Sequence, residues 1–217
     1  MAVTLDNLRV SAKVLANHQQ SSFLSDTEWA LLVNKGYRDL YAEVVEIDPQ
    51  FRVTTASTVT LTPTANSMTL ASDFMNLLAV VRYPGIASRE YYLNPRGIRP
   101  TGELEYRIEG NKIYVEPLSA VTGQFNYRYV PQVADLADPG GTMDVELEQF
   151  RKYVELSAAV DCLASDECDI TTLASLFGVQ KGRVRDWAKK RRKTDHEVVE
   201  DVRRARGWNR MPLDWLP

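Results

Sequence analysis

The sequence has few residues of the kinds that build catalytic, metal or disulfide sites. Its two cysteines, Cys162 and Cys168, lack C-x-x-C spacing and a nearby histidine, which argues against a zinc site and a disulfide framework. The two histidines, His18 and His196, lie far apart in dissimilar contexts, so we expect surface residues rather than bases or ligands. The acidic cluster within residues 161–169 lacks the ligand order of an EF-hand. No glycine motif of nucleotide-binding proteins or serine hydrolases occurs. We therefore expect no enzyme activity, no metal and no cofactor.

Long apolar segments are also missing. No run approaches the roughly 20 residues that a membrane helix needs, and the first residues lack the apolar core of a secretory signal. A hydrophobic content of 44% with 25% charged residues is typical of a globular chain with a core and argues against wholesale disorder. We expect a protein without membrane contacts in a reducing, cytoplasmic setting.

Charge is distributed unevenly along the chain. Residues 181–217 hold 12 Lys and Arg against 6 Asp and Glu, a net +6, so the rest of the chain sums to −9. Such polarity favours contact of the basic part with a polyanion or an acidic partner; the alternative is a solvated helix face. The candidate residues for facing a DNA channel or an acidic partner are Lys181, Arg183, Arg185, Lys189, Lys190, Arg191, Arg192 and Lys193.

Residues 2–47 have the pattern of helices. Ser25 and Glu28 form an S-x-x-E capping box, which predicts a helix start, and Asp48-Pro49 predicts its end. Apolar residues then recur at intervals of three and four, which indicates one buried stripe: Trp29, Leu32, Val33, Tyr37, Leu40, Tyr41 and Val44. A shorter amphipathic helix is expected before it, with Leu5, Leu8, Val14 and Leu15 among its apolar residues.

Residues 51–131 change to the period of β-strands. Alternation from Val53 through Thr55, Ser57 and Val59 to Leu61 predicts one strand with a half-buried face. Further strands are expected over residues 78–83 and 124–130, the latter with three aromatic residues on one side: Phe125, Tyr127 and Tyr129.

A hairpin is the clearest β signal. A two-residue Gly110-Asn111 turn within residues 106–115 predicts an antiparallel pair. The expected register places Glu109 opposite Lys112, Ile108 opposite Ile113, and Tyr106 opposite Val115.

After a linker at Pro139-Gly140-Gly141 the helical period returns. One side of the next helix holds Leu147, Phe150, Val154, Ala158 and either Asp161 or Cys162. The expected fold is α+β, a helical bundle enclosing an inserted antiparallel β-domain, with an extended C-terminal tail. The expected parts are N-terminal helices in 1–48, the β insertion in 49–138, C-terminal helices in 139–205 and the tail in 206–217.

Residues 170–190 have the pattern of a helix-turn-helix unit, with Ala174 facing a partner helix, Gly178 in the turn, and Val184 and Trp187 buried on the second helix. Gln180, Lys181, Arg183 and Arg185 would then approach DNA. The alternative is two packed helices, interrupted or kinked near Gly178 and Gly182, with cations facing outward.

The last residues combine two tryptophans, two prolines and a glycine without any period. Trp208, Leu213, Trp215 and Leu216 either fold back on their own core or anchor in a neighbouring subunit, as tryptophans on extended segments do at interfaces.

Over most of its length the sequence resembles the head-to-tail adaptor (connector) proteins of tailed bacteriophages. The resemblance rests on the stretches FLSDTEW (23–29), VNKGYRDLY (33–41), LASDFMNLL (70–78), YRIEGNKIY (106–114), YRY (127–129) with the proline that follows, and EQFRKY (148–153). The helix-turn-helix-like run departs from the family pattern and leaves a DNA-reading protein as the alternative function.

The resemblance implies a structural virion protein at the head–tail neck, assembled in the host cytoplasm into a ring of about twelve copies. Its implied partners are itself, the portal protein, a tail or nozzle protein, and double-stranded DNA that passes without sequence-specific contact. The residues implied to dock on the portal are Arg206, Trp208, Arg210, Met211, Leu213, Trp215 and Leu216.

Overall fold

The computed structural model describes residues 2–17, 23–83, 90–95, 104–117 and 121–205, with side chains described up to residue 192. The protein has mixed α+β structure and divides into two compact units. One unit combines residues 1–48 with 135–217, and the other comprises residues 49–134. The second boundary lies at 134/135, four residues before the predicted one at 138/139.

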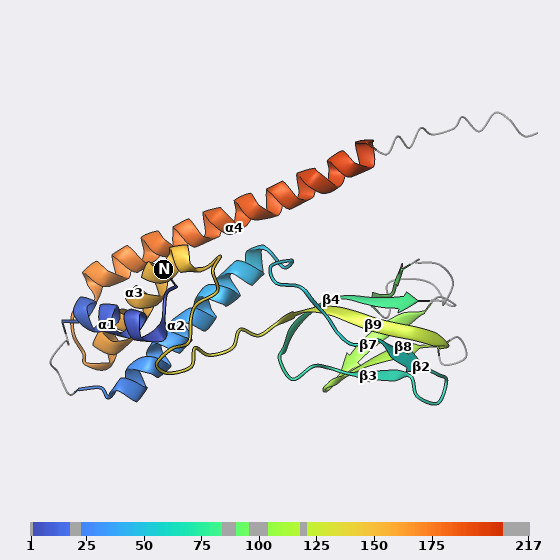
Figure 1. Ribbon diagram of the computed structural model, residues 1–217, viewed down its shortest axis with the longest axis horizontal. Coiled ribbons are helices and arrows are strands. Elements are labelled where there is room, and N and C mark those ends of the chain that lie inside the picture. Colours follow the sequence, from blue (N-terminus) through green and yellow to red (C-terminus); the bar gives the residue numbers. More distant parts are fainter. Residues whose placement is uncertain (1, 18–22, 84–89, 96–103, 118–120, 206–217) are drawn as a thin grey trace, which may run out of the picture. The chain divides into compact units, whose positions relative to one another are not determined.

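The helical unit contains four α-helices (Figure 1): α1 (Leu5–Leu15), α2 (Asp26–Ile47), α3 (Arg151–Ser165) and α4 (Thr171–Ala205). The predicted capping box starts α2, since Ser25 Oγ accepts from the amide of Glu28 and Glu28 Oε2 accepts from the amide of Ser25 at 2.7 Å. The helix ends at Ile47, as the Asp48-Pro49 pair predicts. A single 3-10 turn, Glu148–Phe150, leads into α3.

The helices α1 and α4 each pack on the pair α2 and α3. These two lie close where a Cβ on Gly36 would come within 3.1 Å of the Ser157 Cβ. The predicted stripe of α2 is buried except for Leu32, which is half-buried. On α3 the predicted side is buried and includes Cys162, while Asp161 is half-buried, so the cysteine completes that side. On α1, Leu5 and Leu8 are buried as expected, but Val14 is exposed.

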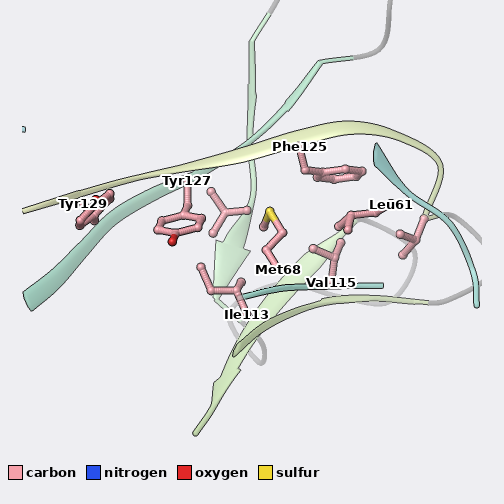
Figure 2. Close-up of a cluster of buried hydrophobic side chains, with 9 residues drawn as sticks. Leu61, Met68, Ile113, Val115, Phe125, Tyr127 and Tyr129 are labelled. Carbon is pink, nitrogen blue, oxygen red and sulfur yellow. The ribbon is translucent and has the colours of Figure 1, made fainter. Parts of the chain in front are cut away.

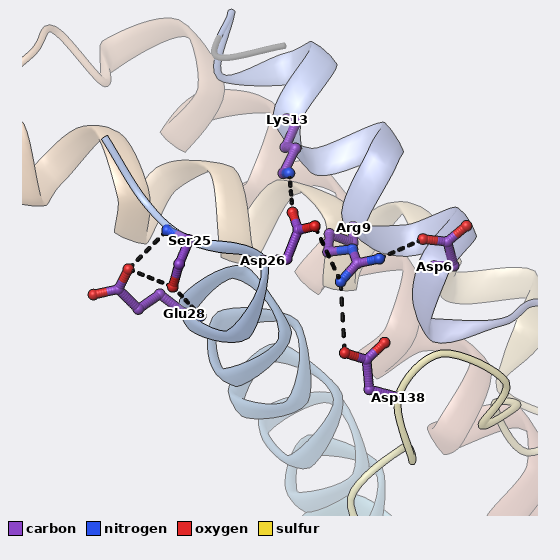
Figure 3. A network of polar contacts seen from close by, with 7 residues as sticks. All are labelled: Asp6, Arg9, Lys13, Ser25, Asp26, Glu28 and Asp138. Carbon is purple, nitrogen blue, oxygen red and sulfur yellow. Dashed lines mark hydrogen bonds and ion pairs between the residues drawn. The ribbon is translucent and has the colours of Figure 1, made fainter. Parts of the chain in front are cut away.

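Arg9 links three segments of the helical unit (Figure 3). Its guanidinium lies 2.6 Å from Asp6 on α1, 4.0 Å from Asp26 at the start of α2, and 3.7 Å from Asp138 in the segment before α3. Lys13 adds a 2.5 Å contact to Asp26. Because the Arg9 side chain is only 13% exposed, this network is partly shielded from solvent and fixes α1 beside the helix that the capping box starts.

The β unit contains two sheets. The first has the order β1–β9–β4–β5, with β2 also paired to β9, and the second has the order β3–β8–β7–β6. All pairs are antiparallel except β6–β7, which is parallel and departs from the expected all-antiparallel insertion. The strands are β1 (Thr54–Thr55), β2 (Val59–Leu61), β3 (Ser67–Thr69), β4 (Phe74–Tyr83), β5 (Tyr91–Tyr92), β6 (Asn94–Pro95), β7 (Glu105–Glu109), β8 (Lys112–Glu116) and β9 (Gly123–Pro131).

The core of the β unit takes side chains from both sheets (Figure 2). The predicted aromatic side of β9 is buried, with Phe125 fully enclosed and Tyr127 and Tyr129 nearly so. It meets residues of the other sheet, such as Ile113 on β8. The Tyr127 hydroxyl accepts from the amide of Ala71 at 2.7 Å and donates to a carbonyl at 3.1 Å, so its one polar atom is satisfied.

The hairpin of β7 and β8 has the predicted register, including Glu109 opposite Lys112 and Ile108 opposite Ile113. Its burial is more uneven than the pattern indicates. Ile113 and Val115 are fully buried, whereas Ile108 is 46% exposed near the turn. The local turn therefore fixed the pairing, and the surrounding sheet decided which apolar residues are covered.

The prediction of one strand from Val53 to Leu61 is wrong. The segment forms two short strands, both paired with β9, and of the expected buried face only Leu61 is buried. Thr55 pairs with Arg128 and Val59 pairs with Phe125. An advance of four residues from β1 to β2 therefore corresponds to an advance of only three residues along β9. An extra residue in one strand interrupts the ladder and turns the following side chains to the other face.

The prediction of a turn or kink at Gly178 is also wrong. Residues 171–205 form the single continuous helix α4, and a Cβ on Gly178 or Gly182 would meet no atom within 4 Å. The chain turns before residue 171 instead, where Asp169 Oδ1 accepts from the amide of Thr171 at 2.9 Å. A helix-turn-helix unit is therefore absent from residues 170–190, because the apolar residues on both sides of Gly178 belong to one uninterrupted helix.

Candidate interaction surfaces of the helical unit

One side of α4 packs against the body of the helical unit. Val184 and Ala188 are fully buried. The ring centroids of Phe177 and Tyr153 are 4.8 Å apart, and Trp187 lies edge-on at 5.2 Å from a second aromatic ring on the turn that precedes α3. These contacts account for the apolar residues that suggested a DNA-binding unit: they fix α4 to α3.

Glu43 is the main polar anchor for α4. This α2 residue is only 8% exposed, and its carboxylate lies 3.1 Å from Lys181 Nζ and accepts a hydrogen bond from Arg185. Burial by itself would raise the pKa of the Glu43 carboxyl, but the hydrogen bonds from Arg185 and Lys181 outweigh it and hold that pKa below its usual range. The same hydrogen bond raises the pKa of Arg185.

A second polar contact fastens α4 near the end of α2. Arg191 Nε lies 3.0 Å from Oδ2 of Asp48, which is 2% exposed, and its guanidinium also donates to Glu146. Arg192 donates to the carbonyl oxygen of Ile47 at 3.4 Å. A cation at this carbonyl satisfies a group that the last turn of α2 leaves unpaired.

The predicted basic surface therefore divides into two sets. Lys181, Arg185, Arg191 and Arg192 have acceptors within their own chain. Arg183 and Lys189 are exposed, Lys190 is exposed but interacts with another group, and the side chain of Lys193 lies outside the described residues. Sequence reasoning missed Glu43 and Asp48, which are 142 and 143 residues away from their arginine partners, because no local pattern connects them.

A polar hollow of about 370 Å³ lies between α2, α3 and the first turns of α4. Lys35 and Asp161 form a 2.5 Å ion pair at its wall, and Tyr153 and Asp39 also line it. Burial, with the nearby negative charges of Glu43 and Asp39, raises the pKa of Tyr153 to about 12. The phenol is therefore protonated at neutral pH.

The pKa of both cysteine thiols is raised. Burial raises the pKa of the Cys162 thiol. Desolvation and a hydrogen bond to Asp166 raise the pKa of Cys168, whose Sγ lies 3.6 Å from the Asp166 carboxylate. Within the described ranges no group of three or more His, Cys, Asp or Glu side chains is arranged to hold a metal ion. No helix among the described residues has the length and apolar content needed to cross a bilayer.

Pairs of exposed apolar side chains lie on two helices of this unit. Val10 and Val14 on α1 are 53% and 50% exposed, and Leu176 and Val179 on α4 are 49% and 55% exposed. Each pair is spaced three or four residues apart and so lies on one side of its helix. Aliphatic residues gathered in this way are typical of surfaces that another protein covers.

The β unit has its own exposed polar and aromatic cluster. Arg128 Nη2 lies 2.7 and 2.8 Å from the two oxygens of Glu90, and its Nη1 donates to the Tyr92 hydroxyl at 3.0 Å. Tyr91 and Tyr92 are more than half exposed. The sequence analysis did not identify these residues, because their grouping depends on the pairing of β5 with β4 and of β4 with β9.

The seven residues expected to dock on the portal, from Arg206 to Leu216, lie outside the described residues. Comparison of the sequence with protein-family models and with curated proteins finds no match.

Proposed function

We propose that this protein is a structural virion protein, the head-to-tail adaptor of a tailed bacteriophage. In this role the four helices form the bundle of the ring-forming body, the β unit faces the tail or nozzle protein, and residues 206–217 form an extended tail that docks on the portal. Viral DNA passes through the channel of a dodecameric ring. In this role buried surface and charged contacts hold the assembly together, and no chemical reaction takes place.

The division of the chain is the observation that carries the proposal. Residues 49–134 form a β unit inserted into a helical unit, and the last helix of that unit, α4, leads directly into the segment with Trp208 and Trp215. This order of parts agrees with the resemblance. Exposed aliphatic pairs on α1 and α4 add surfaces that an assembly can bury.

Contact with DNA in this role is independent of sequence. Arg183 and Lys189 are exposed on α4 and are available to phosphate groups, which carry no base information. Binding of this kind weakens steeply as salt rises. The alternative of sequence-specific reading by residues 170–190 gains no support, since the expected turn is a continuous helix.

The test is assembly with portal protein. Mixed with purified portal rings, the full chain is expected to add a second ring that electron microscopy resolves as an extended neck. A truncated chain ending at residue 205 is expected to lose portal binding while keeping the far-UV circular dichroism and thermal midpoint of the full chain. The matched control is a full-length chain with Trp208 and Trp215 changed to Phe, which keeps aromatic bulk and is expected to retain most binding. A chain that does not bind portal rings, or whose truncation leaves binding unchanged, contradicts the proposal.

A further inference from the structure

Two hydroxyl groups in the polar hollow between α2, α3 and α4 lack a partner among the described residues. Tyr153 and Ser157 on α3 line the hollow and are only 2% and 6% exposed. Neither hydroxyl forms a hydrogen bond with another residue that the structure describes. Their oxygen atoms are not enclosed either, since the enclosed and unpartnered side-chain atoms of the described residues lie in the β unit. Polar groups held this deep are normally hydrogen-bonded, so the partner of these two comes from outside the chain.

The hollow carries a surplus of negative charge. Its lining contains four carboxylates: Asp39, Glu43, Glu46 and Asp161. Three cations line it or bind its carboxylates: Lys35, Lys181 and Arg185. Four negative and three positive charges leave a net charge of −1, which favours a ligand with one positive charge over an anion.

The uncompensated carboxylate beside the two hydroxyls is Asp39. Two of the other lining carboxylates form ion pairs with lysine or arginine, whereas Asp39 forms none with a described residue. Burial, followed by nearby negative charges that include Asp39, raises the pKa of Tyr153, so the Asp39 charge reaches that phenol. Asp39 also lies one helical turn beyond Gly36, where an added Cβ would come within 3.3 Å of Ser157 Oγ. The carboxylate and the two hydroxyls therefore share one part of the hollow.

A guanidinium group fits these partners better than an ammonium group does. Guanidinium is planar and has five N–H donors and no acceptor, whereas an ammonium has three donors and is more strongly hydrated. Its donors match one carboxylate and two hydroxyl oxygens, all of which accept hydrogen bonds. Phe177 lines the hollow and is half-buried, and its ring is a surface on which a flat cation stacks. The volume of about 370 Å³ lies within the range of about 300–1,000 Å³ that is typical of ligand sites.

We infer that the hollow binds a guanidinium group, the group that ends an arginine side chain. The bound group donates to the Asp39 carboxylate and to the hydroxyl oxygens of Tyr153 and Ser157, and it lies against the ring of Phe177. Either an arginine of a protein partner or a free guanidinium compound supplies this chemistry. The site goes beyond the adaptor role and does not depend on it, because all of its groups belong to the helical unit of one chain.

Saturation-transfer difference NMR on the full chain tests the inference, because it detects weak ligands of large proteins and yields their dissociation constants by titration. The probe is the blocked peptide acetyl-Gly-Arg-Gly-amide, whose one charge is the guanidinium. The matched peptide has citrulline, an uncharged isostere, in place of arginine. We expect saturable binding of the arginine peptide and at least about tenfold weaker binding of the citrulline peptide. Methylguanidinium chloride is the third probe: weaker binding than that of the peptide identifies a protein's arginine as the source, and equal binding identifies a free compound.

Two substitutions test the assigned contacts. Asp39→Asn removes the charge but keeps the shape, and is expected to weaken binding of the arginine peptide by at least about tenfold. Tyr153→Phe removes only the hydroxyl and is expected to weaken it by about three- to tenfold. Without ligand, Tyr153→Phe is expected to leave the thermal midpoint unchanged or raised, since the hydroxyl has no partner among the described residues. The control Asp186→Asn changes an exposed acidic residue of α4 outside the hollow and is expected to keep the affinity within about twofold.

Any of four binding results overturns the inference: no saturable binding of the arginine peptide, equal binding of the citrulline peptide, or an affinity that is unchanged by Asp39→Asn or by Tyr153→Phe. Each of these results assigns the two hydroxyls to water. A lower thermal midpoint of the Tyr153→Phe variant without ligand would show that the hydroxyl has a partner within the chain, which also contradicts the inference. Portal attachment is a separate measurement, so its presence or absence decides the adaptor role and leaves this site unaffected.

Discussion

Replacing Glu43 with Gln tests how α4 is held to the rest of the helical unit. Gln keeps the volume and one carbonyl acceptor but removes the charge that Lys181 and Arg185 neutralise. Hydrogen bonds to charged groups contribute about 1.5–3 kcal/mol. Because the two cations are 41% and 47% exposed, water screens part of this contribution. We expect the Glu43→Gln substitution to lower the free energy of unfolding by about 1–2 kcal/mol.

The effect has a defined pH dependence. The pKa of Glu43 is lower in the folded protein, since the hydrogen bonds from α4 outweigh the opposing effect of burial. A carboxyl with a lowered folded-state pKa stabilises the fold above its unfolded pKa of about 4.3. The contribution is lost as pH falls through the folded-state pKa. The difference between the Glu43→Gln variant and the natural protein is therefore expected to be constant near neutral pH, to decline below the unfolded-state pKa and to vanish below the folded-state pKa.

Urea unfolding followed by far-UV circular dichroism measures this difference, because the helical unit dominates that signal. Glu46→Gln is the matched control, since Glu46 lies one turn further along α2 and is exposed. It is expected to change stability by less than about 0.5 kcal/mol. Equal effects of the two substitutions, or a Glu43 effect that does not decline as pH falls below the unfolded-state pKa, would refute the assignment of Glu43 as the anchor of α4.

Three further changes test other parts of the molecule. Phe125→Ala removes a fully buried ring from between the two sheets. It is expected to lower the free energy of unfolding of the β unit, measured in urea, by about 3–5 kcal/mol. Tyr91→Ala, on an exposed strand, is expected to lower it by less than about 0.5 kcal/mol. Gly178→Ala is expected to raise the thermal midpoint, with a gain of about 1 kcal/mol, since the position is helical and open; a loss of stability would indicate a turn there. Alkylation of Cys168 at mildly alkaline pH is expected to be slower than that of an unstructured cysteine peptide, because its raised pKa keeps the thiol protonated, and Asp166→Asn is expected to accelerate it. Equal alkylation rates with and without the Asp166 charge would show that this contact does not control the thiol.

Local chemistry determined the features that the sequence predicted correctly. Ser25 and Glu28 are three residues apart, so their reciprocal hydrogen bonds need nothing beyond one helical turn. The Gly110-Asn111 turn fixes the register of its hairpin because Gly110 has a φ of +57°, which an L-residue with a Cβ adopts only at a cost. The aromatic alternation of β9 likewise depends on the period of a strand alone.

Tertiary structure decided the rest. The segment from Val53 to Leu61 alternates like one strand, but pairing with β9 inserts an extra residue and splits it. Glycine is common in turns, yet α4 continues through Gly178, because Phe177 and Val184 on either side of it pack against the rest of the helical unit. Here contacts with α3 outweigh the weak helix propensity of glycine, which is about 1 kcal/mol.

The sequence by itself determined the start of α2, the hairpin, the α+β class and the concentration of positive charge near the C-terminal end. Which of those cations have partners within the chain was decided only in three dimensions, where Glu43 on α2 and Asp48 directly after α2 bind arginines more than 140 residues away. The physical reason is the separation along the sequence over which each interaction acts. Capping and turn formation involve residues a few positions apart, whereas ion pairs and aliphatic surfaces depend on which helices the fold places side by side.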